Sequence, residues 1–261
     1  MKTRSIVQNI IVYLLIFSLS AGCASVHGPG TESDPLESYN RAMFDFNEGF
    51  YDYILDPIVD AYQFIMPEFV QTGVTNFFSN LNDILVMFNS LLQFKFHDFV
   101  HTLLRFVFNT VFGLFGLIDV ATPMGLPKLH EDFGQTLGSW GVPAGPYFIQ
   151  PLLGPSTIRD TFGDYVDWEY MDPINLHVDD ENTKYGLIGL KAIDTRMSLI
   201  KVDNVVSKST IDKYAFIRDA YLQRRQHLVY DGNPPREKPD FAPASKEDRE
   251  LEDALEKELL Q

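Results

Sequence analysis

Cysteine is almost absent from this chain of 261 residues, which contains only Cys23. An internal disulfide needs two cysteines, so disulfide-stabilised fold classes are excluded. The cysteine ends a segment with a basic start at Lys2 and Arg4, an apolar run from Ile6 to Leu19 and the small residues Ala21-Gly22-Cys23. This arrangement is typical of an export signal.

The residues around Cys23 resemble a bacterial lipobox, in which the cysteine is acylated and becomes the new N-terminus. Ser20 departs from that pattern, which usually has Leu at this place. The resemblance implies a signal peptide over residues 1–22, a palmitate-carrying Cys23 and a flexible linker over residues 23–33. Ala24, where Asp would mark inner-membrane retention, implies the outer membrane. The alternative is an ordinary signal peptide that is cut near Ala24.

Basic residues are also scarce, with 21 Lys and Arg against 36 Asp and Glu and a formal net charge of −15 at pH 7. Loss of Lys2 and Arg4 with the signal would change the charge to −17. Such an acidic chain repels nucleic acid and does not bind anionic lipid through a polybasic patch. We therefore expect no nucleic-acid partner.

Motifs for covalent chemistry are missing. The sequence has neither a G-x-S-x-G nucleophile elbow nor a Gly-rich loop that ends in Gly-Lys-Ser/Thr. His97 and His101 lie four residues apart, as zinc ligands do on a helix, and Asp98 follows the first of them. Asp is too short for the role that Glu has in zinc peptidases, and no third ligand has a confirming spacing. We predict no metal, no cofactor and no enzymatic activity.

Acids at positions 160, 164 and 167 recur at helical spacing beside Arg159. We interpret them as a solvated helix face rather than a catalytic carboxylate pair. Ser156 follows Pro155, and we interpret it as a helix N-cap.

Phenylalanine, by contrast, is abundant and clustered. Residues 77–115 contain ten of the 21 Phe, at positions 77, 78, 88, 94, 96, 99, 106, 108, 112 and 115. From Ile84 to Ile118 the only charged residues are Lys95, Asp98 and Arg105. The sequence therefore separates an apolar region from an acidic remainder.

The most apolar part, residues 97–117, is predicted to be a helix with a polar residue at every fourth position. The polar residues are His97, His101, Arg105 and Asn109. A helix this apolar is buried in a large core or in a membrane. We expect it to lie in one leaflet, with Phe106, Val107 and Phe112 facing lipid or packed protein. The alternative is a soluble core helix whose polar stripe is on the protein surface.

Asn89 and Gln93 form a looser polar stripe on the preceding helix. We expect the two stripes to face each other and to line a wet channel. The channel-lining candidates are Asn89, Gln93, His101, Arg105 and Asn109.

The rest of the chain predicts helices, because no window alternates with period two. A helix is expected from Asp34-Pro35-Leu36-Glu37, with Asp34 as its N-cap, to about Leu55, with breaks at Asp56-Pro57 and Met66-Pro67. The predicted elements that follow are two apolar helices meeting near residues 95–97, turns from Gly113 to Pro155, a short helix over Ser156–Val166, and amphipathic helices over Glu181–Lys201 and Ser209–Tyr230, the second capped by Ser209. The acidic residues 231–261 are predicted to be disordered.

A series of ordered motifs makes the family recognisable. They are Asp34-Pro35-Leu36-Glu37, Asn40-Arg41, Phe44, Phe46-Asn47, Asn76-Phe77-Phe78-Ser79-Asn80-Leu81, Arg105-Phe106, Asn109-Thr110, Gly113, Gly116-Leu117-Ile118-Asp119-Val120-Ala121, Asp132-Phe133-Gly134-Gln135-Thr136-Leu137-Gly138, Gly145-Pro146-Tyr147, Pro151-Leu152-Leu153-Gly154-Pro155-Ser156 and Arg159-Asp160. Over residues 34–230 the chain resembles the MlaA/VacJ family of outer-membrane lipoproteins.

The resemblance implies an all-α, ring-shaped helical body in the periplasmic-facing leaflet of the outer membrane, with an amphipathic central channel. Its implied function is to remove mislocalised phospholipid from the outer leaflet and pass it to a soluble periplasmic MlaC-like carrier, which maintains lipid asymmetry. A trimeric porin is the other implied partner. A mobile hairpin would map to Gly113–Lys128, so the gate and hairpin candidates are Asp45, Phe46, Asn47, Gly113, Gly116 and Gly125.

Two other function classes stay open. A structural lipoprotein that only binds other outer-membrane proteins would fill the lumen with side chains. A phospholipase would need a nucleophile or a metal that the sequence does not reveal.

Overall fold

The computed structural model describes residues 34–235. The predicted signal peptide over 1–22, Cys23 with the linker over 23–33, and the acidic tail from residue 236 onward lie outside the described residues.

Helices dominate the described part, as the sequence predicted. The elements are α2 (Glu37–Phe50), the π-helical turn η1 (Tyr51–Leu55), α3 (Asp56–Ile65), α4 (Glu68–Leu92), α5 (Phe96–Val111), the 3₁₀ turn η2 (Thr122–Met124), α6 (Phe133–Ser139), β1 (Tyr147–Gln150), β2 (Gly154–Thr157), α7 (Ile158–Val166), the π-helical turn η3 (Asp167–Met171), α8 (Pro173–His177), α9 (Glu181–Ser209) and α10 (Lys213–Val229).

The prediction that the chain has no sheet is wrong, because β1 and β2 pair as an antiparallel hairpin. Ile149 lies opposite Pro155, which has no N–H to donate to the ladder. Side chains of α2 bond the strand instead: the amide of Ile149 donates to Asn40 Oδ1 at 2.9 Å, and the hydroxyl of Tyr39 donates to the Ile149 carbonyl at 3.3 Å. Because α2 supplies these bonds, such short strands persist.

The small apolar core lies between β1, α2 and α10. Tyr147, Ile149 and Tyr214 are buried, and four partly buried apolar residues pack around them: Met43, Phe44, Tyr221 and Leu222. The ring of Phe44 meets the edge of Tyr214 at a centroid distance of 5.9 Å. This core joins the first described helix to the last.

The corner at Asp56-Pro57 is a widened turn rather than the predicted break. Pro57 has no N–H for the carbonyl four residues earlier, and the backbone passes from α2 into α3 through the π-helical turn η1. The prediction that Asp34 caps this helix is also wrong, because α2 begins after Leu36 without a side-chain cap. The buried Asp34 carboxylate accepts a hydrogen bond from Asn40 Nδ2 at 2.9 Å.

Of two further predicted boundaries, one is confirmed and the other differs by a few residues. The break at Met66-Pro67 is confirmed between α3 and α4, but α5 ends at Val111 instead of residue 117. Its C-terminal turn stops there because the chain folds back over α5: the amide of Gly116 donates to the Asn109 carbonyl and that of Ile118 to the Gly113 carbonyl, each at 2.9 Å.

The predicted caps of α7 and α10 are wrong by one and three residues. Thr157, not Ser156, accepts the hydrogen bond of the Asp160 amide, and Asp212, not Ser209, accepts that of Ala215. α9 continues to Ser209, and neither α9 nor α10 gathers its apolar residues on one face, contrary to the amphipathic prediction. Charged contacts, described below, hold both helices.

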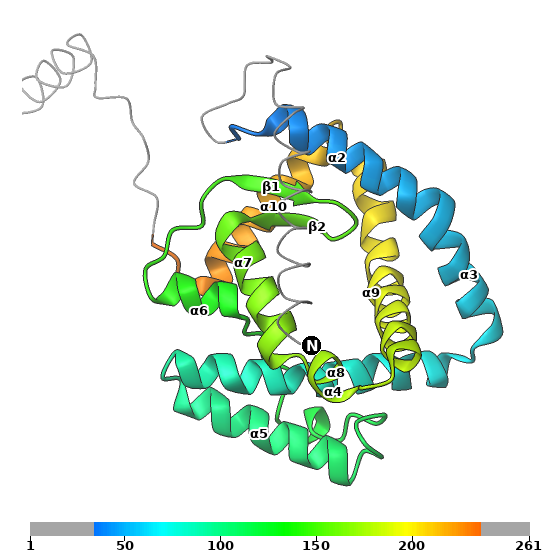
Figure 1. Cartoon of the computed structure of the whole chain (residues 1–261), viewed down its shortest axis with the longest axis vertical. Coiled ribbons are helices and arrows are strands. Elements are labelled where there is room, and N and C mark those ends of the chain that lie inside the picture. Colours follow the sequence, from blue (N-terminus) through cyan, green and yellow to red (C-terminus); the bar gives the residue numbers. More distant parts are fainter. Residues whose placement is uncertain (1–33, 236–261) are drawn as a thin grey trace, which may run out of the picture.

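Figure 1 shows how the elements are arranged. α2 and α3 form one curved outer arm, and α9 lies on its inner side. α6, α7 and the β1–β2 hairpin lie on the opposite side of the molecule, and α4, α5 and α8 lie at one end.

Candidate functional site: buried charge beneath an apolar surface

Large apolar side chains are exposed at many places in the described structure, and two parts of it carry runs of them. One part is the α3–α4 corner, where Phe64 is 92% exposed. The other is α5 with its flanking turns. Together we call them the apolar surface, which consists of Ile58, Phe64, Ile65, Met66, Phe69, Phe94, Phe96, Val100, Leu103, Leu104, Val107, Val111, Phe112, Leu114, Phe115, Leu117 and Ile118. Soluble monomers rarely expose so much apolar area, so this surface fits contact with lipid or protein.

Charged groups are buried directly beneath this surface, where residues 112–128 fold back against α4 and α5. Arg105 is 3% exposed and donates to Asp119 Oδ2 at 2.8 Å, to Thr122 Oγ1 at 2.7 Å and to the Leu126 carbonyl at 2.8 Å. Its Nε lies 3.2 Å from Asp83, a fully buried acid of α4. Arg105 therefore joins two helices to the segment that follows them.

Lys128 and Asn109 complete this cluster. Lys128 Nζ lies 2.5 Å from Asp83 Oδ1 and donates to the Ser79 carbonyl at 2.8 Å. Asn109 Oδ1 accepts the amides of Val120 and Ala121, each at 2.9 Å. We call Asp83, Arg105, Asn109, Asp119 and Lys128 the hairpin clamp.

The charges of the hairpin clamp balance, with two acids and two bases. Burial raises the pKa of Asp83 and lowers that of Lys128, against the attraction between them. Burial also opposes ionisation of Asp119, but hydrogen bonds from Thr122 and Arg105 outweigh it and lower the pKa of Asp119 to about 2.

A close approach of the backbone lets the folded-back segment reach α4. Gly116 has φ of +89°, and a Cβ there would lie 2.6 Å from the side chain of Asn80. The two preceding residues, Leu114 and Phe115, also have positive φ, at 51° and 59°. Such conformations cost free energy and persist only where surrounding contacts hold them. The clamp provides those contacts.

The prediction that Arg105 and Asn109 face a wet channel is wrong, because both side chains are buried and paired with residues 119–126. The four-residue spacing of polar residues identified the polar face of α5 correctly, but it did not reveal that residues 119–126 cover this face. Val107 and Phe112, which were expected to face outward, are both exposed.

The other channel candidates also lie in polar contacts. Asn89 is buried and donates to Asp167 Oδ1 at 3.0 Å, and Gln93 donates to Glu131 Oε2 at 2.7 Å. The ring of His101 is partly buried and stacks on that of His97 at a centroid distance of 6.3 Å. Asn89 and Gln93 thus connect α4 to residues 131–167, Asn89 as a buried side chain and Gln93 as a partly buried one.

The gate and hairpin candidates separate into two groups. Asn47 is buried and fixes the turn of the β hairpin, since it donates to the Gln150 carbonyl at 2.9 Å and accepts the Leu152 amide at 2.7 Å. Asp45 and Phe46 are exposed on the same helix. Gly113 and Gly116 are buried in the folded-back segment, and Gly125 is exposed with φ of +86°.

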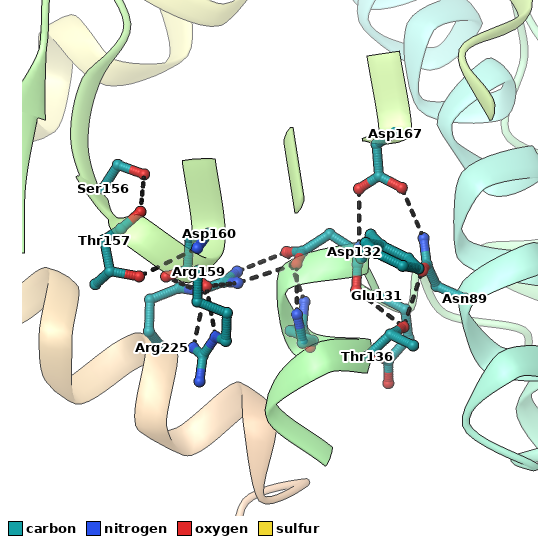
Figure 2. Close-up of polar contacts among 12 residues, drawn as sticks. Asn89, Glu131, Asp132, Thr136, Ser156, Thr157, Arg159, Asp160, Asp167 and Arg225 are labelled. Atoms are coloured by element: carbon teal, nitrogen blue, oxygen red, sulfur yellow. Dashed lines mark hydrogen bonds and ion pairs between the residues drawn. The ribbon is translucent and has the colours of Figure 1, made fainter. Parts of the chain in front are cut away.

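A second buried charged cluster joins α6, α7 and α10, and the sequence interpretation missed it. Figure 2 shows Arg225 between two acids: it lies 2.5 Å from Asp132 Oδ2 and 2.8 Å from Asp160 Oδ1. Arg159 also pairs with Asp160, at 3.0 Å. We call Asp132, Arg159, Asp160, Asp164, Asp167 and Arg225 the acidic junction.

The interpretation of residues 160, 164 and 167 as a solvated face is therefore wrong for two of the three. Asp160 and Asp167 are buried, while Asp164 is exposed. Asp167 accepts hydrogen bonds from Asn89 and from the Phe133 amide, at 3.0 and 2.9 Å. The signal that could have revealed the junction is Arg225, because the residues one helical turn away from it on α10 are uncharged: Tyr221, Leu222, Leu228 and Val229.

Two acids of the junction have pKa values above the usual range of an aspartate. Burial raises the pKa of Asp167 to about 6, and neighbouring acids including Asp132 add to the effect. The pKa of Asp164 is also raised to about 6, because the surrounding protein removes part of the hydration of its carboxyl group although the residue reaches the surface, and because Asp132 and Asp160 lie nearby. Asp160 and Asp132 differ, because bonds from Arg225 outweigh their burial and lower the pKa of each.

Two searches of residues 34–235 bear on function. No three His, Cys, Asp or Glu side chains there are arranged to hold a metal ion. None of the described helices combines the length and the apolarity that crossing a bilayer requires.

Comparison with known proteins agrees with the resemblance. The model of the MlaA lipoprotein family matches residues 32–228. The chain is 38% identical over 232 residues to the intermembrane phospholipid transport system lipoprotein MlaA of Escherichia coli strain K12, covering 85% of this chain and 89% of that one. It is 32% identical over 241 residues to the lipoprotein of the same name from Haemophilus influenzae, covering 89% and 93%.

A solved structure is similar as well, from work on the structural basis for maintenance of bacterial outer membrane lipid asymmetry. It superposes with a TM-score of 0.65 at 36% identity and covers 76% of this chain and 100% of its own. The chain belongs to the MlaA lipoprotein family.

Proposed function

We propose that this protein is an outer-membrane lipoprotein that moves misplaced phospholipid out of the outer leaflet without changing it chemically. The observation that carries the proposal is the reversed distribution of side chains. Charged residues such as Asp83 and Arg105 are buried, whereas Phe64 and Phe115 are exposed. The relatives named for intermembrane phospholipid transport support the same function.

The reversed distribution suits a body that sits in one leaflet. Exposed phenylalanines are stable in hydrocarbon, and a charge there is costly unless it is paired inside the protein. The hairpin clamp pairs its charges in this way. We propose that the apolar surface contacts acyl chains, and that Cys23 anchors the chain to the periplasmic-facing leaflet.

A ring-shaped body with a central passage would lower the barrier to lipid movement. A phospholipid head group must otherwise cross hydrocarbon, where loss of hydration is expensive. In Figure 1, α7, α9 and the β hairpin lie around the middle of the molecule, where we place this passage. The proposed partners are a trimeric porin and a soluble MlaC-like carrier.

The alternative is a scaffold lipoprotein that binds other membrane proteins and moves no lipid. The apolar surface would suit protein contacts equally well. Transport activity of the purified chain separates the two functions, because a scaffold has none.

The test uses full-length protein in vesicles that contain a short-chain fluorescent phospholipid. Albumin outside the vesicles extracts only label in the outer leaflet, so movement from the inner leaflet raises the extractable fraction. We expect that rise, with no release of free fatty acid or head group, and intact lipid should pass to the carrier. An extractable fraction equal to that of empty vesicles would contradict the proposal, and products that increase with protein concentration would make the protein an enzyme.

Cells provide an independent check. A strain without the gene should accumulate phospholipid in its outer leaflet and become sensitive to detergent and chelator.

A further inference from the structure

Several charged contacts attach the long helix α9 to its neighbours. Of the α9 side chains that the structure describes, three are buried: Asp194, Arg196 and Val206. A helix that packs permanently normally buries an apolar stripe. Here two of the three buried side chains are charged.

Arg196 makes the most extensive of these contacts. Its Nε and Nη2 bond the two carboxylate oxygens of Asp56, at 2.6 and 2.9 Å, and its guanidinium lies 4.5 Å from the ring centroid of Tyr51. Asp203 of α9 accepts a further bond from Nη2 at 3.1 Å. Planar two-point pairing of this kind fixes orientation as well as distance.

Two more polar contacts attach α9 to other elements. Thr75 of α4 donates to Asp194 at 2.5 Å, and burial raises the pKa of that acid. Lys191 lies 3.3 Å from Asp172, before α8, and is 43% exposed. These two contacts reach α4 and the start of α8, whereas the Arg196 pair reaches α3.

Asp56 and Asp172 occupy equivalent positions. Each precedes a proline and follows a five-residue π-helical turn, η1 or η3. Such turns widen the helix because the proline cannot donate its hydrogen bond, and they are frequent at functional sites. Two pliable corners of the chain are therefore held by bases on one helix.

We propose that α9 docks reversibly on α3 and α4 and serves as a movable wall of the lipid passage, with Arg196 as its latch. This inference rests on the proposed function. α9 lies on the inner side of the α2–α3 arm (Figure 1), so displacement of α9 toward the arm or away from it would change the width of the proposed passage.

Polar docking makes such movement possible. When α9 moves away from its neighbours, water can form hydrogen bonds with Arg196 and Asp194 in place of their protein partners, which offsets part of the lost interaction. Exposure of an apolar interface to water has no such compensation. Hinges at π-helical turns would absorb the change in backbone direction.

The test locks the helix in its docked position. Thr75→Cys with Asp194→Cys places two thiols where the side chains now meet, and a short reducible bis-thiosulfonate linker joins them in the full chain. The assay is extraction of fluorescent phospholipid by albumin. We expect the linked protein to lose transport and the reduced protein to regain it. Asp56→Cys with Arg196→Cys repeats the test at the second contact.

A matched control uses Arg41→Cys with Asp212→Cys, which joins α2 to the start of α10 across an exposed ion pair. The same linker there should leave transport intact. Full transport by the protein linked at α9, or failure of both α9 pairs to link, overturns the inference. Absence of transport by the wild-type chain instead defeats the proposed function.

Discussion

The hairpin clamp and the acidic junction both bury charge, but they balance it differently. In the clamp two acids face two bases, beneath a surface of exposed phenylalanines. In the junction four acids face two arginines, and one acid, Asp164, is exposed. A surplus of acid is tolerable where water reaches the cluster, and an exact balance is needed where it does not. Under the proposed function, this difference predicts that the side of the hairpin clamp faces lipid.

The largest expected effect comes from removing a base of the clamp. Arg105→Met leaves Asp119 without a base and Asp83 with Lys128 alone, and breaking a buried pair in this way costs about 3–5 kcal/mol. Thermal unfolding in detergent, followed by circular dichroism, measures the loss. Arg41→Met is the control. The ion pair between Arg41 and Glu37 is partly exposed to solvent and should contribute less than about 1 kcal/mol to the free energy of unfolding. Equal losses in the two variants would show that the clamp is no tighter than a surface pair.

The junction should differ from the clamp in its response to pH. The folded pKa of Asp167 is about 6, above its unfolded value, so the folded state binds the proton more tightly. Stability should therefore decrease as pH rises from about 4 to about 6 and then level off, by on the order of 2–3 kcal/mol for this buried acid. Asp167→Asn should reduce the slope to the part that Asp164 contributes. A wild-type unfolding free energy that is constant over this range would refute the raised pKa.

A smaller effect is expected where α6 and α7 approach each other. A Cβ at Gly163 would lie 2.3 Å from the Gly134 nitrogen, so Gly163→Ala must push the helices apart at about 1–3 kcal/mol. Gly186→Ala is the matched control on α9, where a Cβ meets nothing within 4 Å. Alanine there should stabilise the helix by about 0.5–1 kcal/mol. Changes of opposite sign in the free energy of unfolding, a loss for Gly163→Ala and a gain for Gly186→Ala, would support the close packing of α6 and α7. Changes of the same sign would contradict it.

The sequence predicted the helices and the Met66-Pro67 corner because those signals are local. It could not predict what the polar face of α5 contacts, since a four-residue period marks a face and not its covering. The folded-back segment that covers Arg105 depends on Asn109 accepting two amides more than ten residues away. The β hairpin was missed for a similar reason. Its Ile149 bonds Asn40 across 109 residues, a contact that no local pattern reveals.

The central claim is that the apolar surface lies in lipid, and thiol accessibility tests it most directly. Single cysteines replace Phe64 and Phe115 in the apolar surface and the exposed Asp219 of α10. Cys23 is the only native cysteine and is predicted to be acylated, so no other thiol should react. In vesicles, a charged water-soluble thiol reagent should label position 219 and leave positions 64 and 115 unlabelled. Equal labelling rates at all three positions would contradict the account.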